Sequence, residues 1–353
     1  MTPKELEAVD LKLVSLPRTL FIAASVVLAV ALCGGPARAD EAIWRNHMNT
    51  AAEAAKRGDH AAAVQMYGAA LKQTSGFAEN DTRIAATYFG LAQAQRAQYD
   101  YPAAEKSHLR ALTLLESANS TVREPQHELL QRKASVLNAL GDLYRVQSRY
   151  SEAETSFRRE LSIIEQTQGR DSPLVARALS NNFAALYRAQ GRRDEAEAAY
   201  KRALAILEKS VPADDTRLGF ALIDLAEWYQ GLQRHAEAEP YYRRGIPLVE
   251  NSFPPAHPRV LHLLQDWGVV TQLQGRYKEA EVVYRMLLRL IEKTYGVDHP
   301  NVAFALNNFV GLYEVQGRRA DADAVRKRML ALSNAPLRTQ PYVPEQGLPP
   351  RRK

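Results

Sequence analysis

The sequence predicts an all-α protein, a solenoid of about seven helix-turn-helix repeats, from three observations. Apolar residues follow the three- and four-residue spacing that is typical of helices. No strand-like alternation of apolar and polar residues is sustained anywhere in the chain. One alanine recurs with a period near 42 residues, at Ala63, Ala104, Ala153, Ala196, Ala238, Ala280 and Ala322.

The first 39 residues have the features of a secretory signal peptide. An apolar run at residues 20–35, LFIAASVVLAVALCGG, follows Arg18 and precedes an Ala-x-Ala motif at residues 37–39. These features together favour cleavage after Ala39. The run is shorter than the roughly 20 residues that a membrane-spanning helix needs. We therefore expect a protein secreted across the inner membrane of a bacterium, into the periplasm.

Two other interpretations keep the chain at the membrane. The apolar run also fits an uncleaved signal anchor, or lipid attachment at Cys33, although Leu32 stands where a lipidated cysteine usually follows a small residue. Removal of residues 1–39 leaves no cysteine and lowers the net charge only from +6 to +5, because four basic and three acidic residues are lost. This small charge predicts no nucleic-acid partner.

Each repeat is expected to contain two helices. In the repeat around Ala153, Leu137, Leu140 and Tyr144 share one helical face, and Phe157 follows the anchor alanine on a second apolar stripe. Neither helix can bury its apolar face alone, but stacked pairs can. Small residues that let paired helices approach recur at Gly141, Ala184, Ala226 and Gly268. Aromatic residues, expected to fill the space beside the small residues of the next helix, recur at Phe157, Tyr200, Tyr242 and Tyr284.

Residues 168–192 are nearly copied at residues 295–318, and one residue near Ser180 separates the two spacings. Three loops between repeats contain a proline that is expected at the start of the next helix, where the missing N–H costs nothing. These prolines are Pro173, Pro258 and Pro300. His257 and His299 precede two of them and lie one repeat apart, so we interpret them as loop residues and not as a metal pair.

The order of these residues resembles the tetratricopeptide repeat: a small residue, tyrosine three later, alanine nine after that and an aromatic four later. The 42-residue period, the Gly-x-Asp-x-Pro loop and the run ALNNF…LY…QGR at residues 305–318 resemble the kinesin light chain subtype. The resemblance covers residues 44–332 and is strongest over residues 135–332. It implies a right-handed superhelix whose first helices line a concave groove, where asparagines hold peptides.

The sequence contains no catalytic constellation. It lacks a phosphate-binding glycine loop, a His-Glu-x-x-His motif and a Gly-x-Ser-x-Gly elbow, and its eight histidines are scattered. Recurring carboxylate pairs such as Glu195 with Glu197, and Glu237 with Glu239, are interpreted as solvated starts of the second helices. We therefore expect no enzymatic activity, no cofactor, no metal and no small-molecule substrate.

Asparagine recurs at one position of the first helix, as Asn138, Asn181 and Asn307. Asparagine in a helix interior costs about 0.6 kcal/mol relative to alanine, so its recurrence requires a compensating interaction. Two interpretations stay open at this point. The amide makes a hydrogen bond within the protein, or it binds the main chain of an extended peptide in the groove.

Residues four and seven positions after this asparagine lie on the same helical face. The residue seven positions after the asparagine is basic in the earlier repeats and neutral to acidic in the later ones: Arg96, Arg145, Arg188, Gln230, Gln272 and Glu314. In one repeat the asparagine position itself is occupied by Gln265. If this face binds the partner, we expect a protein or extended peptide that is acidic where it crosses the arginines.

The domain prediction is a signal peptide at residues 1–39, a solenoid at residues 40–332 and a Pro-rich flexible tail at residues 333–353. The predicted function is a non-enzymatic scaffold or adaptor that binds a protein or peptide in the groove. The alternatives are a membrane-tethered assembly factor, if the N-terminal segment is retained, and a regulatory subunit of an enzyme complex.

Overall fold

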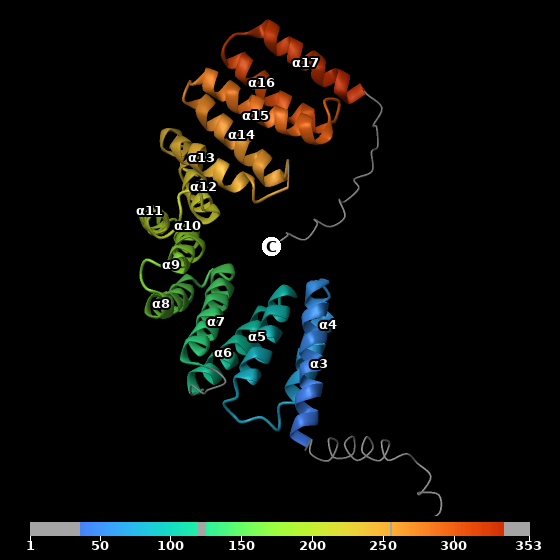
Figure 1. The fold of residues 1–353 in the computed structure, drawn as a ribbon, viewed down its shortest axis with the longest axis vertical. Helices are drawn as coiled ribbons and strands as arrows, with labels where there is room; N and C mark the ends of the chain where they lie inside the picture. The colour runs from blue at the N-terminus through green and yellow to red at the C-terminus, as the bar shows by residue number, and fades with distance from the viewer. Residues whose placement is uncertain (1–35, 119–124, 255, 335–353) are drawn as a thin grey trace, which may run out of the picture. The chain divides into compact units, whose positions relative to one another are not determined.

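A computed structural model describes residues 36–118, 125–254 and 256–334. These residues form helices arranged in seven consecutive pairs, which confirms the predicted all-α repeat fold (Figure 1). The predicted signal peptide, except for residues 36–39 at the start of the first helix, lies outside the described residues, as does the tail beyond residue 334. None of the described helices is both long and apolar enough to cross a membrane.

The chain divides into two compact units, one ending at Arg170 and the other starting at Asp171. The first unit contains three pairs: α3 (Pro36–Lys56) with α4 (His60–Lys72), α5 (Thr82–Ala97) with α6 (Tyr101–Ser117), and α7 (Gln126–Val146) with α8 (Tyr150–Gln168). The second unit contains four pairs: α9 (Pro173–Ala178), η1 (Leu179–Ala184) and α10 (Ala185–Ala189) with α11 (Arg193–Ser210), α12 (Thr216–Gly231) with α13 (His235–Glu250), α14 (Pro258–Leu273) with α15 (Tyr277–Tyr295), and α16 (Asn301–Val315) with α17 (Arg319–Asn334).

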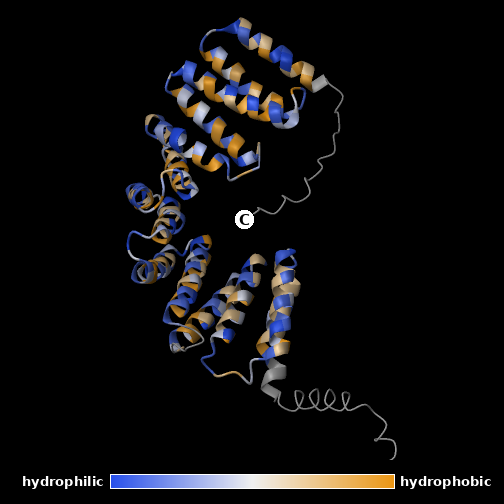
Figure 2. Cartoon of the chain, viewed as in Figure 1, coloured by the Kyte–Doolittle hydropathy of each residue, from blue (hydrophilic) through white to orange (hydrophobic). Residues whose placement is uncertain are grey.

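Several helices begin where the local sequence supplies a capping side chain. The carboxylates of Asp59, Asp81, Asp100 and Asp215 accept backbone N–H groups at the starts of α4, α5, α6 and α12. These caps satisfy donors that a helix start leaves without an intrahelical partner. Most of the helices are amphipathic, and Figure 2 shows hydrophobic and hydrophilic residues alternating around them.

The anchor alanines form the core of the pairs. All seven have no exposed surface. In the first unit, Ala63 packs in one buried cluster with Tyr67 and Leu91, and in the second unit Ala280 packs with Tyr284 and Phe309. A side chain at Gly141 or Gly268 would overlap the ring of Phe157 or Tyr284, so glycine allows the two helices of those pairs to approach. At these two positions a small residue therefore faces an aromatic residue, as predicted, but the two belong to one pair, and the prediction that the aromatic lies beside the next helix is wrong there.

The extra residue near Ser180 is absorbed by a π-helix. The first helix of the second unit is continuous from α9 through η1 to α10, and η1 holds the additional residue in its wider turns. Single π-helical turns of this kind are commonly found at functional sites. Within η1, Asn181 is exposed while the adjacent Asn182 is buried.

A recurring contact joins the second helix of one pair to the first helix and turn of the next pair. In the first unit, Tyr144 donates to Glu105 Oε1 at 3.3 Å, and Arg149 donates to both carboxylate oxygens of Glu105 at 2.5 and 3.0 Å. The Arg149 guanidinium also lies 4.4 Å from the centre of the Tyr144 ring. We call this Glu–Tyr–Arg arrangement the inter-repeat clamp.

The second unit repeats the clamp with Glu197, Tyr229 and Arg234, where Tyr229 donates at 2.9 Å and Arg234 at 2.6 Å. Glu281, Tyr313 and Arg318 form another clamp. At Glu239, Thr271 stands at the tyrosine position, and Trp267, one helical turn earlier, donates to the carboxylate beside Arg276. The expectation that Glu197 and Glu239 are solvated is therefore wrong, and Glu239 is only 4% exposed. Carboxylates two residues apart at a helix start lie on different faces. Glu195 and Glu237 are therefore exposed and pair with the turn arginines Arg192 and Arg234.

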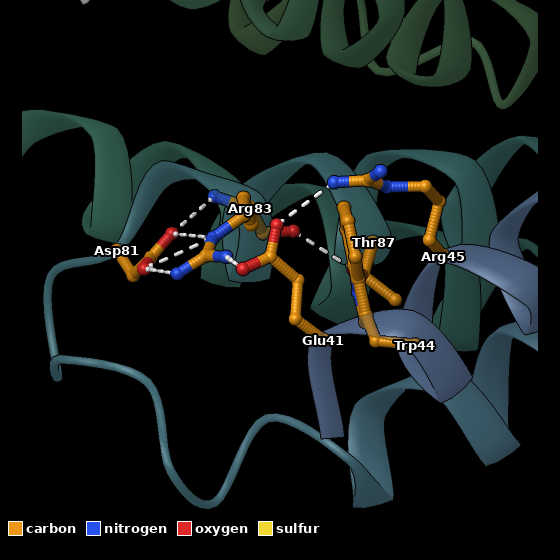
Figure 3. A network of polar contacts seen from close by, with 6 residues as sticks. All are labelled: Glu41, Trp44, Arg45, Asp81, Arg83 and Thr87. Carbon is orange, nitrogen blue, oxygen red and sulfur yellow. Dashed lines mark hydrogen bonds and ion pairs between the residues drawn. The ribbon is translucent and has the colours of Figure 1, made fainter. Parts of the chain in front are cut away.

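The first pair is joined to the second by a different network (Figure 3). Trp44 of α3 donates to Thr87 Oγ1 of α5 at 2.9 Å. Arg83 is held by its own helix cap, Asp81, at 2.7 Å and by Glu41 of α3 at 3.2 Å. Glu41 also accepts from Arg45. These contacts tie two successive first helices together at the N-terminal end of the repeats.

The close approach at Gly268 can be tested by replacement with alanine. Because the added Cβ would overlap the Tyr284 ring, we expect Gly268→Ala to lower the free energy of unfolding by about 1–3 kcal/mol. Gly311 of α16 is the matched control, since nothing lies within 4 Å of a Cβ placed there. Gly311→Ala should raise stability by about 0.5–1 kcal/mol. Equal effects in urea unfolding would contradict the packing described here.

The clamp predicts a pH dependence of stability. Burial raises the pKa of Glu197, but hydrogen bonds from Lys201, Tyr229 and Arg234 outweigh it and bring the pKa down to about 2. The folded state therefore gains stability above the ordinary carboxyl pKa, near 4.5, and loses it as the pH falls towards 2. Glu197→Gln should be less stable than wild type at pH 7, and the difference in urea midpoint should shrink between pH 5 and pH 2. Glu250→Gln, at an exposed glutamate without an ion pair or hydrogen bond in the described residues, is the control and should not differ.

Candidate protein-interaction surface

The sequence-predicted site residues all lie on first helices of their pairs. We call this set the first-helix stripe. In the first unit it comprises Arg96 on α5 with Asn138 and Arg145 on α7, and in the second unit Asn181 on η1, Arg188 on α10, Gln230 on α12, Gln265 and Gln272 on α14, and Asn307 on α16.

In the second unit, the last residue of the stripe in each repeat makes a polar contact within its own repeat. Its partner is the residue twelve positions later, on the second helix of the same pair. Arg188 donates to the Tyr200 hydroxyl at 3.2 Å, and the Tyr284 hydroxyl donates to Gln272 at 3.0 Å. The other two pairs are Tyr242 with Gln230 and Arg326 with Glu314. In the last repeat both partners change together, so that an ion pair replaces the hydrogen bond between a tyrosine and an amide.

The first unit lacks this contact. The corresponding second-helix residues are His108 and Phe157, neither of which has a hydroxyl group. The Arg96 guanidinium makes no hydrogen bond or ion pair with any described residue. Arg145 pairs with Asp142 at 3.0 Å, but its Nε is buried without a partner. The Arg96 guanidinium therefore keeps its donors for an external acceptor. The Arg145 side chain is 30% exposed, so it can offer only the terminal guanidinium N–H groups that Asp142 does not occupy.

His108 is fully buried, and neither ring nitrogen has a partner in the described residues. Its ring packs against Phe89 with the centroids 5.5 Å apart. Burial, and secondarily the charge of Arg96, lower the pKa of His108 to about 4. The ring is therefore neutral at pH 7 and fills the place of the aromatic residue found there in every other repeat except the last, which has Arg326.

The amides of the stripe divide into two groups. Asn138 donates to Oε2 of Glu160, a buried carboxylate on α8, at 3.2 Å. For Asn138 the first of the two interpretations, a hydrogen bond within the protein, therefore applies. Asn181, Gln265 and Asn307 occupy the same repeat position in the second unit and make no hydrogen bond with any described residue. Asn181 and Asn307 are exposed and Gln265 is half-buried, so these three amides are available to a ligand.

Three half-buried carboxylates lie beside the stripe on α12 and α14. Burial, together with the neighbouring charge of Glu227, raises the pKa of Asp224 to about 6. Burial also raises the pKa of Glu227 and of Asp266. Arg259 pairs with Glu227 at 2.7 Å, and Gln230 donates to Asp266 at 3.2 Å, which links two successive first helices.

Sequence reasoning missed this acidic group. Asp224 and Asp266 occupy the same repeat position, 42 residues apart, so the periodicity that found the asparagines contains the signal. Their proximity to Glu227 and Arg259 depends on how α12 and α14 pack. The described residues contain no group of three or more histidine, cysteine, aspartate or glutamate side chains arranged to hold a metal ion.

The loop histidines cap helices. His257 and His299 each accept, through Nδ1, the backbone N–H two residues later, at 3.2 and 3.1 Å. Their rings stack on Phe253 and Tyr295 with centroids 4.7 and 4.8 Å apart. This equivalent use in successive repeats agrees with their interpretation as loop residues.

The fold and its first-helix stripe define a helical-repeat protein with polar side chains available for non-covalent contacts. The chain belongs to the tetratricopeptide repeat family, whose model matches residues 132–209, 175–251 and 257–334, more than half of the sequence. No curated protein sequence matches the chain.

Similar solved structures include kinesin light chain nearly identical TPR-like repeats of Podosopora anserina, at 19% identity and a TM-score of 0.48, covering 57% of this chain and 95% of that one. A STAND signal-transduction ATPase with a tetratricopeptide repeat sensor from Pyrococcus horikoshii has 15% identity and a TM-score of 0.60, covering 81% and 41%. Aspartyl phosphate phosphatase F of Bacillus subtilis has 13% identity and a TM-score of 0.55, covering 88% and 75%. At these identities the likeness concerns the fold alone.

The acidic group predicts a second pH effect, opposite in sign to that of the clamp. Because the pKa of Asp224 is about 6 in the folded protein and near 3.8 ordinarily, its charge opposes folding above pH 6. Asp224→Asn should therefore raise the free energy of unfolding at pH 7.5, by on the order of 1–3 kcal/mol. The gain should disappear below pH 4, where the wild-type carboxyl is protonated in both states. A variant that is less stable than wild type at pH 7.5 would contradict this.

Proposed function

We propose that the chain is a non-catalytic scaffold or adaptor that binds a protein or an extended peptide along its first-helix stripe. The observation that carries the proposal is the set of free amides Asn181, Gln265 and Asn307, each at the same position of its repeat. Asparagine in a helix interior is unfavourable, so an internal role for Asn181 and Asn307 would require a partner that both lack. Membership of the tetratricopeptide repeat family supports a function in protein interaction.

An extended partner suits this spacing. An amide side chain both donates and accepts, so it can bind the N–H and C=O groups of a peptide backbone. Packed helices lie about 8–10 Å apart, and an extended chain advances about 3.3 Å per residue. Amides on successive first helices would therefore bind peptide residues about three positions apart. Gln265 and Asn307 lie on successive first helices and form one such step, while Ile223 interrupts the series on α12 with a fully buried side chain.

The partner segment that crosses the first unit is acidic in this proposal. The Arg96 guanidinium has no partner in the described residues, and the Arg145 side chain, which bonds Asp142 through one terminal nitrogen, is 30% exposed. A carboxylate can accept two parallel hydrogen bonds from one guanidinium group. In the second unit Arg188 is already engaged with Tyr200, and the carboxylates of α12 and α14 disfavour an acidic segment beside them. Acidic recognition is therefore assigned to Arg96 and Arg145.

The proposed location is the bacterial periplasm, after cleavage behind Ala39. The support is the basic start, the short apolar run and the small-residue flank of residues 1–39. The mass of the protein purified from its native cells tests this directly. Loss of residues 1–39 supports the secreted form, whereas an intact N-terminus or a lipid on Cys33 would instead support the membrane-tethered assembly factor. Co-purification with an enzyme whose activity it changes would favour the regulatory subunit.

The assignment of acidic recognition to Arg96 and Arg145 is tested by reversing the charge of both residues. Peptides selected on the wild-type chain from a random display library should be enriched in Asp and Glu. Their affinity for Arg96→Glu with Arg145→Glu should fall at least tenfold, about 1.4 kcal/mol, and their wild-type affinity should fall with added salt.

Arg110→Glu is the matched control, because Arg110 is an exposed arginine on the second helix α6 of the same unit. It should bind the selected peptides as wild type does. Circular dichroism should show unchanged helicity in both proteins. Equal affinity of the doubly reversed protein and the wild type would remove Arg96 and Arg145 from the recognition surface.

A further inference from the structure

The outer faces of the second helices carry a repeated ion pair. An arginine at one repeat position pairs with a glutamate on the second helix of the preceding repeat. In the second unit Arg244 of α13 pairs with Glu208 of α11 at 2.8 Å, and Arg328 of α17 pairs with Glu292 of α15 at 2.5 Å. In the first unit Arg159 of α8 pairs with Glu116 of α6. These outer ion pairs hold successive second helices side by side.

Helix α15 breaks this pattern. Met286 stands where α13 and α17 have arginine, 42 residues from each, and 42% of it is exposed. Its expected partner, Glu250 of α13, is exposed and makes no ion pair or hydrogen bond with any described residue. One helical turn earlier, Val282 is 55% exposed. Two apolar side chains therefore replace an ion pair on one face of one helix.

Two free cations continue the same face. Arg289 and Lys293 follow Met286 by three and seven residues, which places them on its side of the helix. Both are exposed, and neither makes an ion pair or hydrogen bond within the described residues. We call Val282, Met286, Arg289 and Lys293 the α15 outer patch. A flexible methionine beside free cations is the composition of an adaptable binding surface.

We propose that the α15 outer patch is a second docking surface, which binds an acidic amphipathic segment of a partner protein. The segment would place an apolar side chain against Val282 and Met286, and carboxylates against Arg289 and Lys293. This surface lies on a second helix of the second unit. It is independent of the first-helix stripe and does not rest on the function proposed for it.

The charges and the packing favour this partner over two others. The apolar residues on the opposite side of α15, Tyr284, Leu287 and Ile291, are buried in the core, so the helix cannot turn its main apolar face to a lipid bilayer. The chain carries a net charge of +6, which opposes pairing of its basic surfaces in a second copy. An acidic segment complements the patch in charge, and it also suits the exposed apolar pair.

The test uses the intact chain and a helical peptide display library. Peptides are enriched on the wild type and depleted on Met286→Arg, which restores the arginine of the other repeats opposite Glu250. We expect the surviving peptides to combine Leu, Met or Phe with Asp and Glu. The best synthetic peptide should protect residues 278–293 from hydrogen exchange, and its Kd should rise at least tenfold with Met286→Arg and with Arg289→Glu plus Lys293→Glu.

Lys209→Glu is the matched charge control, because Lys209 is the exposed equivalent of Lys293 two repeats earlier, on α11. It should leave the Kd unchanged, as should the pair of arginine reversals in the first unit, which separates this surface from the first-helix stripe. Met286→Arg should unfold at or above the wild-type midpoint. Failure to find a peptide that discriminates between wild type and Met286→Arg would overturn the proposal, as would protection outside α15. Sedimentation of wild type but not Met286→Arg with phosphatidylcholine–phosphatidylglycerol vesicles would assign the patch to lipid and also overturn it.

Discussion

The inter-repeat clamp is the interaction on which the other features of each unit depend. A repeat protein has no contacts between distant parts of its sequence, so its stability rests on each repeat and on the interface with its neighbour. Glu105, with Tyr144 and Arg149, closes one such interface through a carboxylate that accepts from a hydroxyl and a guanidinium at once. Charge-assisted bonds of this kind are short and directional, so they fix the angle between successive pairs as well as holding them.

Internal contacts also limit what the first-helix stripe can offer a partner. Arg188, Gln230 and Gln272 look like ligand-binding side chains in sequence, yet each is bound to a tyrosine of its own repeat. Where that tyrosine is replaced, as by His108, the first-helix arginine is released. The binding character of a stripe position therefore depends on a residue twelve positions away, on the other helix of the pair.

Departures from the repeat are informative because the repeat itself is explained by packing. An alanine at each anchor position needs no function beyond filling the space between two helices. Asp224 is different, since its burial raises its pKa and opposes folding at neutral pH. Met286 also departs from the pattern, because it leaves Glu250 without the arginine that the other repeats provide. Residues that lower stability, or that give up a contact made in the other repeats, are not explained by packing. Binding to an external partner would explain why they are present.

The sequence by itself determined the number of helix pairs and the recurrence of small and aromatic positions in them, because these follow from local periodicity and side-chain volume. It also located the insertion at Ser180, since one extra residue in a near copy must be absorbed nearby. Only the tertiary structure decided that this insertion forms a π-helix, and that Asn138 is bound internally while Asn181 is free. Glu195 and Glu197 were likewise indistinguishable in sequence. The physical reason is that neighbouring polar residues on a helix differ only in the direction of their side chains. Whether a side chain is bound internally or left free depends on which residues of the next helix lie in that direction.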